Sequence, residues 1–302
     1  MTFKEKRIKS KKKKSRTVQI VLMAVCLLLS ITFIGPILMV VSASLSSESD
    51  ILKYGYTILP REIDFAAYKY VFKNPKVILD AYKVTIIYSF SSMVLSTLLQ
   101  AMMAYPLSKR NLKGKSFLSF YLYFTCLFSG GLIPTYILNT QYLHLNNTMW
   151  IYILPSLIGP FNIFMMRSFF EDIPYEVSES AIIDGASEYT IFFRFIIPLS
   201  KPVLATVSLL TFLGKWNDWY TSLLYIDDQT LVSLQYMLQR ILNNIQILKN
   251  SSMNAIDIAA IDIPGETARM AMAVIAAGPA LVIFPFFQKY FVKGLTVGSV
   301  KG

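Results

Sequence analysis

The stretch from residue 172 to residue 202 reads DIPYEVSESAIIDGASEYTIFFRFIIPLSKP. Pro174 favours the start of a helix, Gly185 favours its end, and Ser187 followed by Glu188 can begin another. The pattern predicts two short helices joined by a tight turn.

Apolar and polar residues alternate in the second of these short helices. We expect its apolar residues to form an exposed stripe that another surface must cover. The stripe consists of Ile191, Phe192 and Phe195.

The surrounding chain has a composition that suits lipid. Of its 302 residues, 54% are hydrophobic and 16% are charged, and the mean hydropathy is +0.50. Soluble domains carry roughly 25% charged residues. We therefore expect an all-α integral membrane protein.

Apolar stretches divide the chain into spans and loops. A helix rises about 1.5 Å per residue, so about 20 residues cross a hydrocarbon core of roughly 30 Å. We expect six transmembrane helices within a membrane domain from residue 18 to residue 302. They cover residues 18–44, 84–107, 117–138, 150–166, 203–225 and 270–287.

Basic residues predict the orientation of these spans. Residues 1–17 form a basic tail directly before the first span, which is typical of a cytoplasmic anchor at anionic lipid headgroups. A nuclear-targeting or RNA-binding arm is the alternative for this tail, but an apolar run follows it and we expect no nucleic acid partner. About two thirds of the 29 basic residues fall in the inner segments. Both termini and the loop 172–202 should therefore face the cytoplasm.

The outer loop 226–269 contains apolar residues spaced by threes and fours, which predicts an amphipathic helix outside the membrane. A lid on the outer mouth and a substrate-contacting element are both open for it. These residues are Leu231, Leu234, Met237, Leu238, Ile241, Leu242 and Ile245.

Catalytic chemistry has little support in the sequence. His144 is the single histidine, so it cannot supply a multi-histidine metal site. Gly114-Lys115-Ser116 resembles the end of a phosphate loop, but Lys109 stands where that motif requires glycine. We expect no catalytic residue, no metal site and no nucleotide site in this chain.

Ionisable and aromatic residues meet in the fifth span. Lys215 and Asp218 lie three residues apart, at a depth where charged groups usually face a cavity or each other. Aromatic faces, amides and carboxylates can hold a sugar, and an ion pair with an interfacial aromatic belt is the equal alternative. The candidates for a substrate path are Trp216, Asn217, Asp218 and Trp219, with Asn162 in the fourth span as a weaker one.

The segment 172–202 resembles the EAA loop of permease subunits in binding-protein-dependent ABC importers. Glu179-Ser180-Ala181 stands in the E-A-A place, Asp184-Gly185-Ala186 matches the D-G-A core, and Ile197-Pro198-Leu199 matches the closing I-P-L. Ser180 departs from the alanine of that pattern.

Further stretches resemble the carbohydrate branch of that family, of the maltose type that carries oligosaccharides or polysaccharide fragments. They are PFNIFMMRSFF from residue 160, WNDW from residue 216 and the ending from residue 288.

The resemblance implies a type I importer permease fold in a bacterial plasma membrane. It also implies a second homologous permease subunit, two cytoplasmic ATPase subunits that bind ATP and magnesium, and an extracytoplasmic sugar-binding protein. The loop would dock in a groove of the ATPase. ATP hydrolysis would belong to that partner, so we expect that this chain is not itself an enzyme. The coupling residues implied are Glu179, Ala181, Asp184, Gly185, Ala186, Ile191, Phe192, Phe195 and Pro198.

Two other classes are compatible with a helical membrane protein. An ion-coupled secondary transporter working without an ATPase would be favoured by several buried carboxylates and an inverted repeat. A membrane-embedded enzyme would need a cluster of catalytic residues at one depth. The sequence shows neither pattern.

Overall fold

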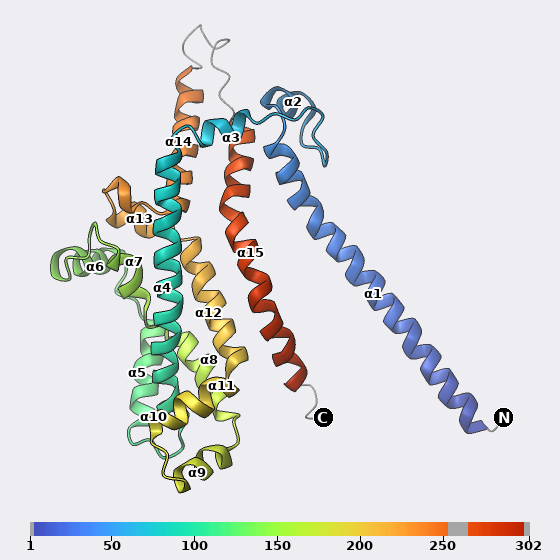
Figure 1. Ribbon diagram of the computed structural model, residues 1–302, viewed down its shortest axis with the longest axis vertical. Coiled ribbons are helices and arrows are strands. Elements are labelled where there is room, and N and C mark those ends of the chain that lie inside the picture. Colours follow the sequence, from blue (N-terminus) through green and yellow to red (C-terminus); the bar gives the residue numbers. More distant parts are fainter. Residues whose placement is uncertain (1–2, 253–264, 299–302) are drawn as a thin grey trace. The chain divides into compact units, whose positions relative to one another are not determined.

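The computed structural model describes the backbone of residues 3–252 and 265–298, and the side chains of residues 18–247 and 265–288. Helices dominate these ranges (Figure 1), and β-structure within them is limited to one isolated bridge between Ser46 and Ile63. The expected all-α fold class is confirmed.

Three uninterrupted helices are long and apolar enough to cross a membrane. They are α1 (Phe3–Ser44), α4 (Pro75–Ser108) and α15 (Glu266–Gly298), with apolar parts Val18–Ser44, Pro75–Ser108 and Glu266–Gln288. The sequence placed its first, second and sixth spans inside these same stretches.

Three bent pairs of helices supply the other apolar stretches. The pair α5 (Lys115–Leu127) and α6–η1 (Leu132–Tyr142) bends by 109°, and α7–η2 (Trp150–Ser156) and α8 (Pro160–Glu171) by 52°. The stretch from α10 to α11 (Glu188–Leu199) and α12 (Lys201–Trp216) bend by 81°. Counting each pair as one span gives up to six spans in the described part of the chain.

The breaks occur where the sequence cannot continue a helix. Gly130 and Gly131 separate α5 from α6, and Gly159 precedes Pro160, the first residue of α8. Proline has no backbone N–H, so the carbonyl four residues before it loses its helical partner. We expected one helix over each of residues 117–138, 150–166 and 203–225, whereas the first two regions are bent and the third is interrupted after Trp216.

Short helices complete the fold. Three of them lie in the loops before α4 and after α12: α2 (Glu48–Tyr54), α3 (Ala66–Val71) and the 3₁₀ turn η4 (Gln229–Leu231). Within the bent stretches, α6 is Leu132–Ile137, η1 Leu138–Tyr142, α7 Trp150–Ile153 and η2 Leu154–Ser156. The segment 172–202 contains α9 (Tyr175–Ile183), α10 (Glu188–Ile191), η3 (Phe192–Ile196) and α11 (Ile197–Leu199), and α13 (Tyr220–Tyr225) and α14 (Leu234–Ser252) follow α12. Helix α14 confirms that the loop 226–269 contains a helix.

The chain divides into two compact units. The first comprises Met1–Lys73 and Ile245–Ile275. In it, the buried carboxylate of Glu48 accepts hydrogen bonds of 2.9 Å from the backbone N–H groups of Glu266 and Thr267 and from the Thr267 hydroxyl. Glu48 therefore caps the first turn of α15, where backbone N–H groups have no helical partner.

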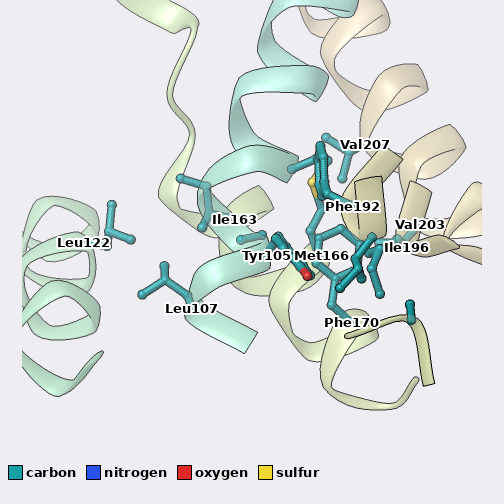
Figure 2. Packing of buried hydrophobic residues seen from close by; sticks show 14 residues of the cluster. Tyr105, Leu107, Leu122, Ile163, Met166, Phe170, Phe192, Ile196, Val203 and Val207 are labelled. Atoms are coloured by element: carbon teal, nitrogen blue, oxygen red, sulfur yellow. The ribbon is translucent and has the colours of Figure 1, made fainter. Parts of the chain in front are cut away.

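The second unit comprises Asn74–Asn244 and Ala276–Gly302. Here α4 packs along both α8 and α12 (Figure 1). Figure 2 shows the apolar cluster between these helices, and Ile163, Met166 and Val207 in it are fully buried. The cluster also includes residues of the segment 172–202, so that segment is anchored in the unit's own core.

Candidate functional site

The segment 172–202 folds as two short helices around a tight turn. Helix α9 begins after Pro174 and ends at Ile183. Gly185 follows with φ +79°, and Ser187 caps α10 by accepting a hydrogen bond of 3.3 Å from the Thr190 N–H. The local signals of the sequence therefore gave the correct helix, turn and cap.

Gly185 is required by the backbone conformation of this turn. Its φ lies in the left-handed region, which costs other residues roughly 1–2 kcal/mol. A Cβ built on Gly185 would meet no atom within 4 Å. The space beside this glycine is open in the chain itself, so close approach by a partner is compatible with the geometry.

The apolar residues of the segment divide into a buried and an exposed set. Ile191 is 0% exposed and Phe192 is 3% exposed, and both belong to the internal cluster of Figure 2. We expected both on an exposed stripe, and that expectation was wrong because both are buried in a cluster with residues of α4, α8 and α12. Phe195 is 37% exposed, and Ala181 is buried.

The exposed apolar residues lie elsewhere on the segment, where sequence reasoning did not place them. Ile183 is 81% exposed and Tyr189 is 72% exposed, on either side of the Gly185 turn, and Ile182 is also exposed. Their position next to Asp184-Gly185-Ala186 was the available signal, because a turn between two helices projects its flanking side chains outward.

Carboxylates surround this exposed face. A shallow cavity of about 260 Å³ is lined by Glu176, Glu179, Ser180, Ile183 and Asp184. Glu179 and Asp184 are exposed. Of the other expected coupling residues, Ala186 is half-buried and Pro198 is exposed. An apolar tip with acidic neighbours can bind a partner surface that combines an apolar depression with basic groups.

Two ion-pair clusters fasten the helix ends next to the segment. The Lys109 ammonium lies 2.7 and 2.9 Å from the Glu188 carboxylate oxygens, and the Tyr105 hydroxyl donates to that carboxylate at 2.6 Å. Burial lowers the pKa of Lys109, but hydrogen bonding to Glu188 outweighs it and holds this pKa above its ordinary value. The second cluster joins Glu171 to Lys115 and Arg167, at 3.0 Å each.

The expected substrate-path residues surround a break in the fifth apolar stretch. Helix α12 ends at Trp216, and α13 begins at Tyr220. Trp216 is 1% exposed, and its indole N–H donates to the Ala276 carbonyl at 2.9 Å. The Trp216 ring is thus packed between helices.

The remaining residues of the break differ in their availability. The Asp218 carboxylate accepts hydrogen bonds from the Thr221 N–H and hydroxyl, and it lies 3.7 Å from the Lys215 ammonium. Asn217 and Trp219 are exposed, and Asn162 is half-buried. Asn217 and Trp219 therefore have the more accessible side chains.

Buried polar residues of α4 bind backbone carbonyls at two helix breaks, the one between η2 and α8 and the one after α12. The sequence analysis missed these residues. The Tyr88 hydroxyl donates to the Lys215 carbonyl at 3.0 Å. Ser96 donates to the Ser156 and Leu157 carbonyls at 3.0 Å, and Gln100 donates to the Leu157 carbonyl at 2.8 Å. The signal was polar residues at helical spacing inside an apolar span.

The sequence matches the family model "Binding-protein-dependent transport system inner membrane component" over residues 77–297. It is similar to Protein LplC of Bacillus subtilis (strain 168), with 40% identity over 268 residues, 88% of this chain and 89% of that protein. It is also similar to the Polygalacturonan/rhamnogalacturonan transport system permease protein YtcP of the same strain, with 35% identity over 296 residues, 96% of this chain and all of that protein.

A solved structure supports the same assignment. It is the crystal structure of a bacterial ABC transporter involved in the import of the acidic polysaccharide alginate. A chain of that structure has 29% sequence identity to this one with a TM-score of 0.76, and the match covers 92% of this chain and 98% of that chain.

The fold and the matches define the class of protein. This chain is a multi-pass membrane permease, and it belongs to the family of inner membrane components of binding-protein-dependent transport systems. It is the permease subunit of an ABC importer, in which the ATPase is a separate subunit.

Proposed function

We propose that this chain carries an oligosaccharide or a polysaccharide fragment into the cytoplasm. Three similar permeases belong to transport systems for polygalacturonan or rhamnogalacturonan, for arabinooligosaccharides and for galactooligosaccharides. All of these are carbohydrates of more than one unit, and together they support the substrate class.

The exposed face of the segment 172–202 carries the proposal that ATP hydrolysis drives this transport. Ile183 projects beside the acidic residues Glu179 and Asp184, and the neighbouring turn at Gly185 is open. Such a face on a membrane protein suits a cytoplasmic partner. We assign it to the docking of an ATPase subunit, with the buried Ala181, Ile191 and Phe192 holding the face in shape.

The assembly and its orientation follow from the same assignment. A second homologous permease would complete the pathway, two ATPase subunits would bind ATP and magnesium, and an extracytoplasmic sugar-binding protein would deliver the sugar. The basic tail 1–17 supports cytoplasmic termini. The domain division into this tail and a membrane domain of residues 18–302 is part of the proposal.

The break after α12 is the proposed sugar contact of this chain. Discontinuous helices often form transporter binding sites because their ends expose polar backbone groups. Asn217 offers an amide, and Trp219 offers an exposed aromatic face. The buried Trp216 fixes the end of α12 through its hydrogen bond to the Ala276 carbonyl. The Lys215–Asp218 ion pair stabilises the conformation of the break.

Uptake in cells tests the proposed function. Cells that express this chain, a second permease, the ATPase and the binding protein should accumulate labelled oligogalacturonates, arabinooligosaccharides or galactooligosaccharides. Omitting this chain should abolish accumulation. Accumulation of every one of these sugars at the same rate without this chain would refute the proposal.

A further inference from the structure

The start of α10 is fastened to the end of α4. Glu188 is the first residue of α10, Lys109 directly follows α4, and Tyr105 lies in the last turn of α4. One carboxylate oxygen of Glu188 accepts hydrogen bonds from both Tyr105 and Lys109, at 2.6 and 2.7 Å. The Lys109 ammonium also lies 4.8 Å from the centre of the Tyr105 ring. Three groups thus join the segment 172–202 to α4.

This cluster is more than an exposed ion pair. The Lys109 side chain is only 23% exposed, although that of Glu188 is 60% exposed. Hydrogen bonds to a charged group are shorter and stronger than neutral ones. The Tyr105 ring packs against Phe192, with ring centres 5.3 Å apart. The polar cluster therefore lies at the edge of the apolar core and is in direct contact with it.

Helix α4 leads from this cluster to both breaks. It runs without interruption from Pro75 to Ser108, whereas the apolar stretches that follow it as far as α12 are bent pairs. Its buried Ser96 and Gln100 hold the carbonyls before α8, and Tyr88 holds the carbonyl of Lys215. A displacement of the cytoplasmic end of α4 would therefore reach the residues around Asn217.

We propose that Tyr105, Lys109 and Glu188 form a strut, through which movement of the segment 172–202 shifts α4 and thereby the two breaks. The three are positioning residues, and the proposal rests on the proposed function of the segment as the ATPase-docking element. The strut is required to convert ATP hydrolysis into sugar movement, and it is not required for the ATPase to bind.

The second ion-pair cluster provides a matched control. Glu171 accepts from Lys115 and Arg167 at 3.0 Å, and its side chain is 39% exposed. It joins the start of α5 to the end of α8, and it lies outside the segment 172–202. Lys115 also donates a hydrogen bond of 3.2 Å to the Lys109 carbonyl, and Glu171→Gln does not remove this donor or acceptor. A glutamate-to-glutamine change at Glu171 removes a comparable interaction at a comparable place.

The test uses the full complex in proteoliposomes with labelled tetragalacturonate as the sugar. ATP hydrolysis and sugar uptake are measured together, and the readout is sugar moved per ATP hydrolysed. Glu188→Gln should lower this ratio by at least about fivefold, the lower end of typical coupling between sites. Glu171→Gln should change it by less than about twofold, because Glu171 joins α8 to α5 and makes no ion pair with the segment 172–202.

Charge exchange separates the strut from general destabilisation. Lys109→Glu alone should lower the ratio as Glu188→Gln does, and Lys109→Glu combined with Glu188→Lys should restore at least part of it. All variants should retain the ATPase on co-purification. Equal ratios for Glu188→Gln and Glu171→Gln would overturn the strut while leaving the proposed function intact. A wild-type complex that hydrolyses no ATP would overturn the proposed function, and the strut with it.

Discussion

Replacing Phe192 and Ile183 separately with alanine distinguishes internal packing from partner binding within the segment 172–202. Phe192 is 3% exposed, and its ring centre lies 5.3 Å from that of Tyr105. Removing a buried phenylalanine costs about 3–5 kcal/mol of folding free energy. Ile183 is 81% exposed, so its removal should change the folding free energy by no more than about 0.5 kcal/mol.

For ATPase binding the order of the two variants should be reversed: Ile183→Ala should have the larger effect and Phe192→Ala the smaller one. An isoleucine that becomes buried against a partner contributes roughly 1.5–3 kcal/mol. Ile183→Ala should therefore weaken ATPase binding roughly 10- to 150-fold. Phe192→Ala should affect binding through loss of folded protein, so its binding per folded molecule should change much less.

Two assays are needed for this comparison. Thermal unfolding of the isolated chain in detergent measures the folding effect, and titration of the purified ATPase into the detergent-solubilised chain measures the binding effect. Wild-type ATPase affinity in Ile183→Ala would refute the assignment of the exposed face. Wild-type thermal stability in Phe192→Ala would refute the assignment of Phe192 to the core.

Three further predictions concern other parts of the chain. Gly185→Ala should destabilise the turn by roughly 1–2 kcal/mol. Gly185→Trp should in addition block ATPase binding in a pull-down. Normal binding by Gly185→Trp would contradict the proposed close approach of the ATPase to this turn. Asn217→Ala should lower sugar uptake and cost only about 1 kcal/mol of stability, because its amide donates one hydrogen bond of 2.9 Å to the Leu213 carbonyl. Trp216→Ala should lower thermal stability by more, because the Trp216 ring is buried, and the reverse pattern would contradict the proposed sugar path. Burial raises the pKa of Glu48, but the hydrogen bonds from Thr267 and Glu266 outweigh it and lower this pKa below its ordinary value. Glu48 therefore stabilises the fold above the ordinary carboxyl pKa and loses this effect as the pH falls, so Glu48→Gln should be less stable than wild type at neutral pH and approach it in acid, as thermal unfolding at several pH values would show.

Local signals made the segment 172–202 predictable. Pro174, Gly185 and Ser187 each act on the backbone within a few residues, and the structure has a helix, a left-handed turn and a cap at these positions. The amphipathic spacing in the loop 226–269 likewise predicted α14. The family resemblance drawn from the same segment is confirmed by the family match.

Properties that depend on distant residues were beyond the sequence. Ile191 and Phe192 are buried in a cluster with residues of α4, α8 and α12, and local periodicity does not identify such distant neighbours. The break after Trp216 is stabilised by Tyr88, 127 residues earlier than the Lys215 whose carbonyl it binds. Hydropathy over a window measures apolar length, so it did not show that the third and fourth stretches bend or that the fifth is broken after Trp216. The proposed roles of the site residues stay predictions.

ATP dependence of sugar uptake in proteoliposomes tests the central claim most directly. The complex of this chain with its second permease and ATPase is reconstituted, the binding protein is loaded with labelled tetragalacturonate, and ATP is supplied only on the ATPase side. The account predicts that label accumulates with ATP and the binding protein, and that it does not accumulate with a proton or sodium gradient in place of ATP. Accumulation driven by an ion gradient through this chain alone would contradict the account and would identify it as an ion-coupled transporter.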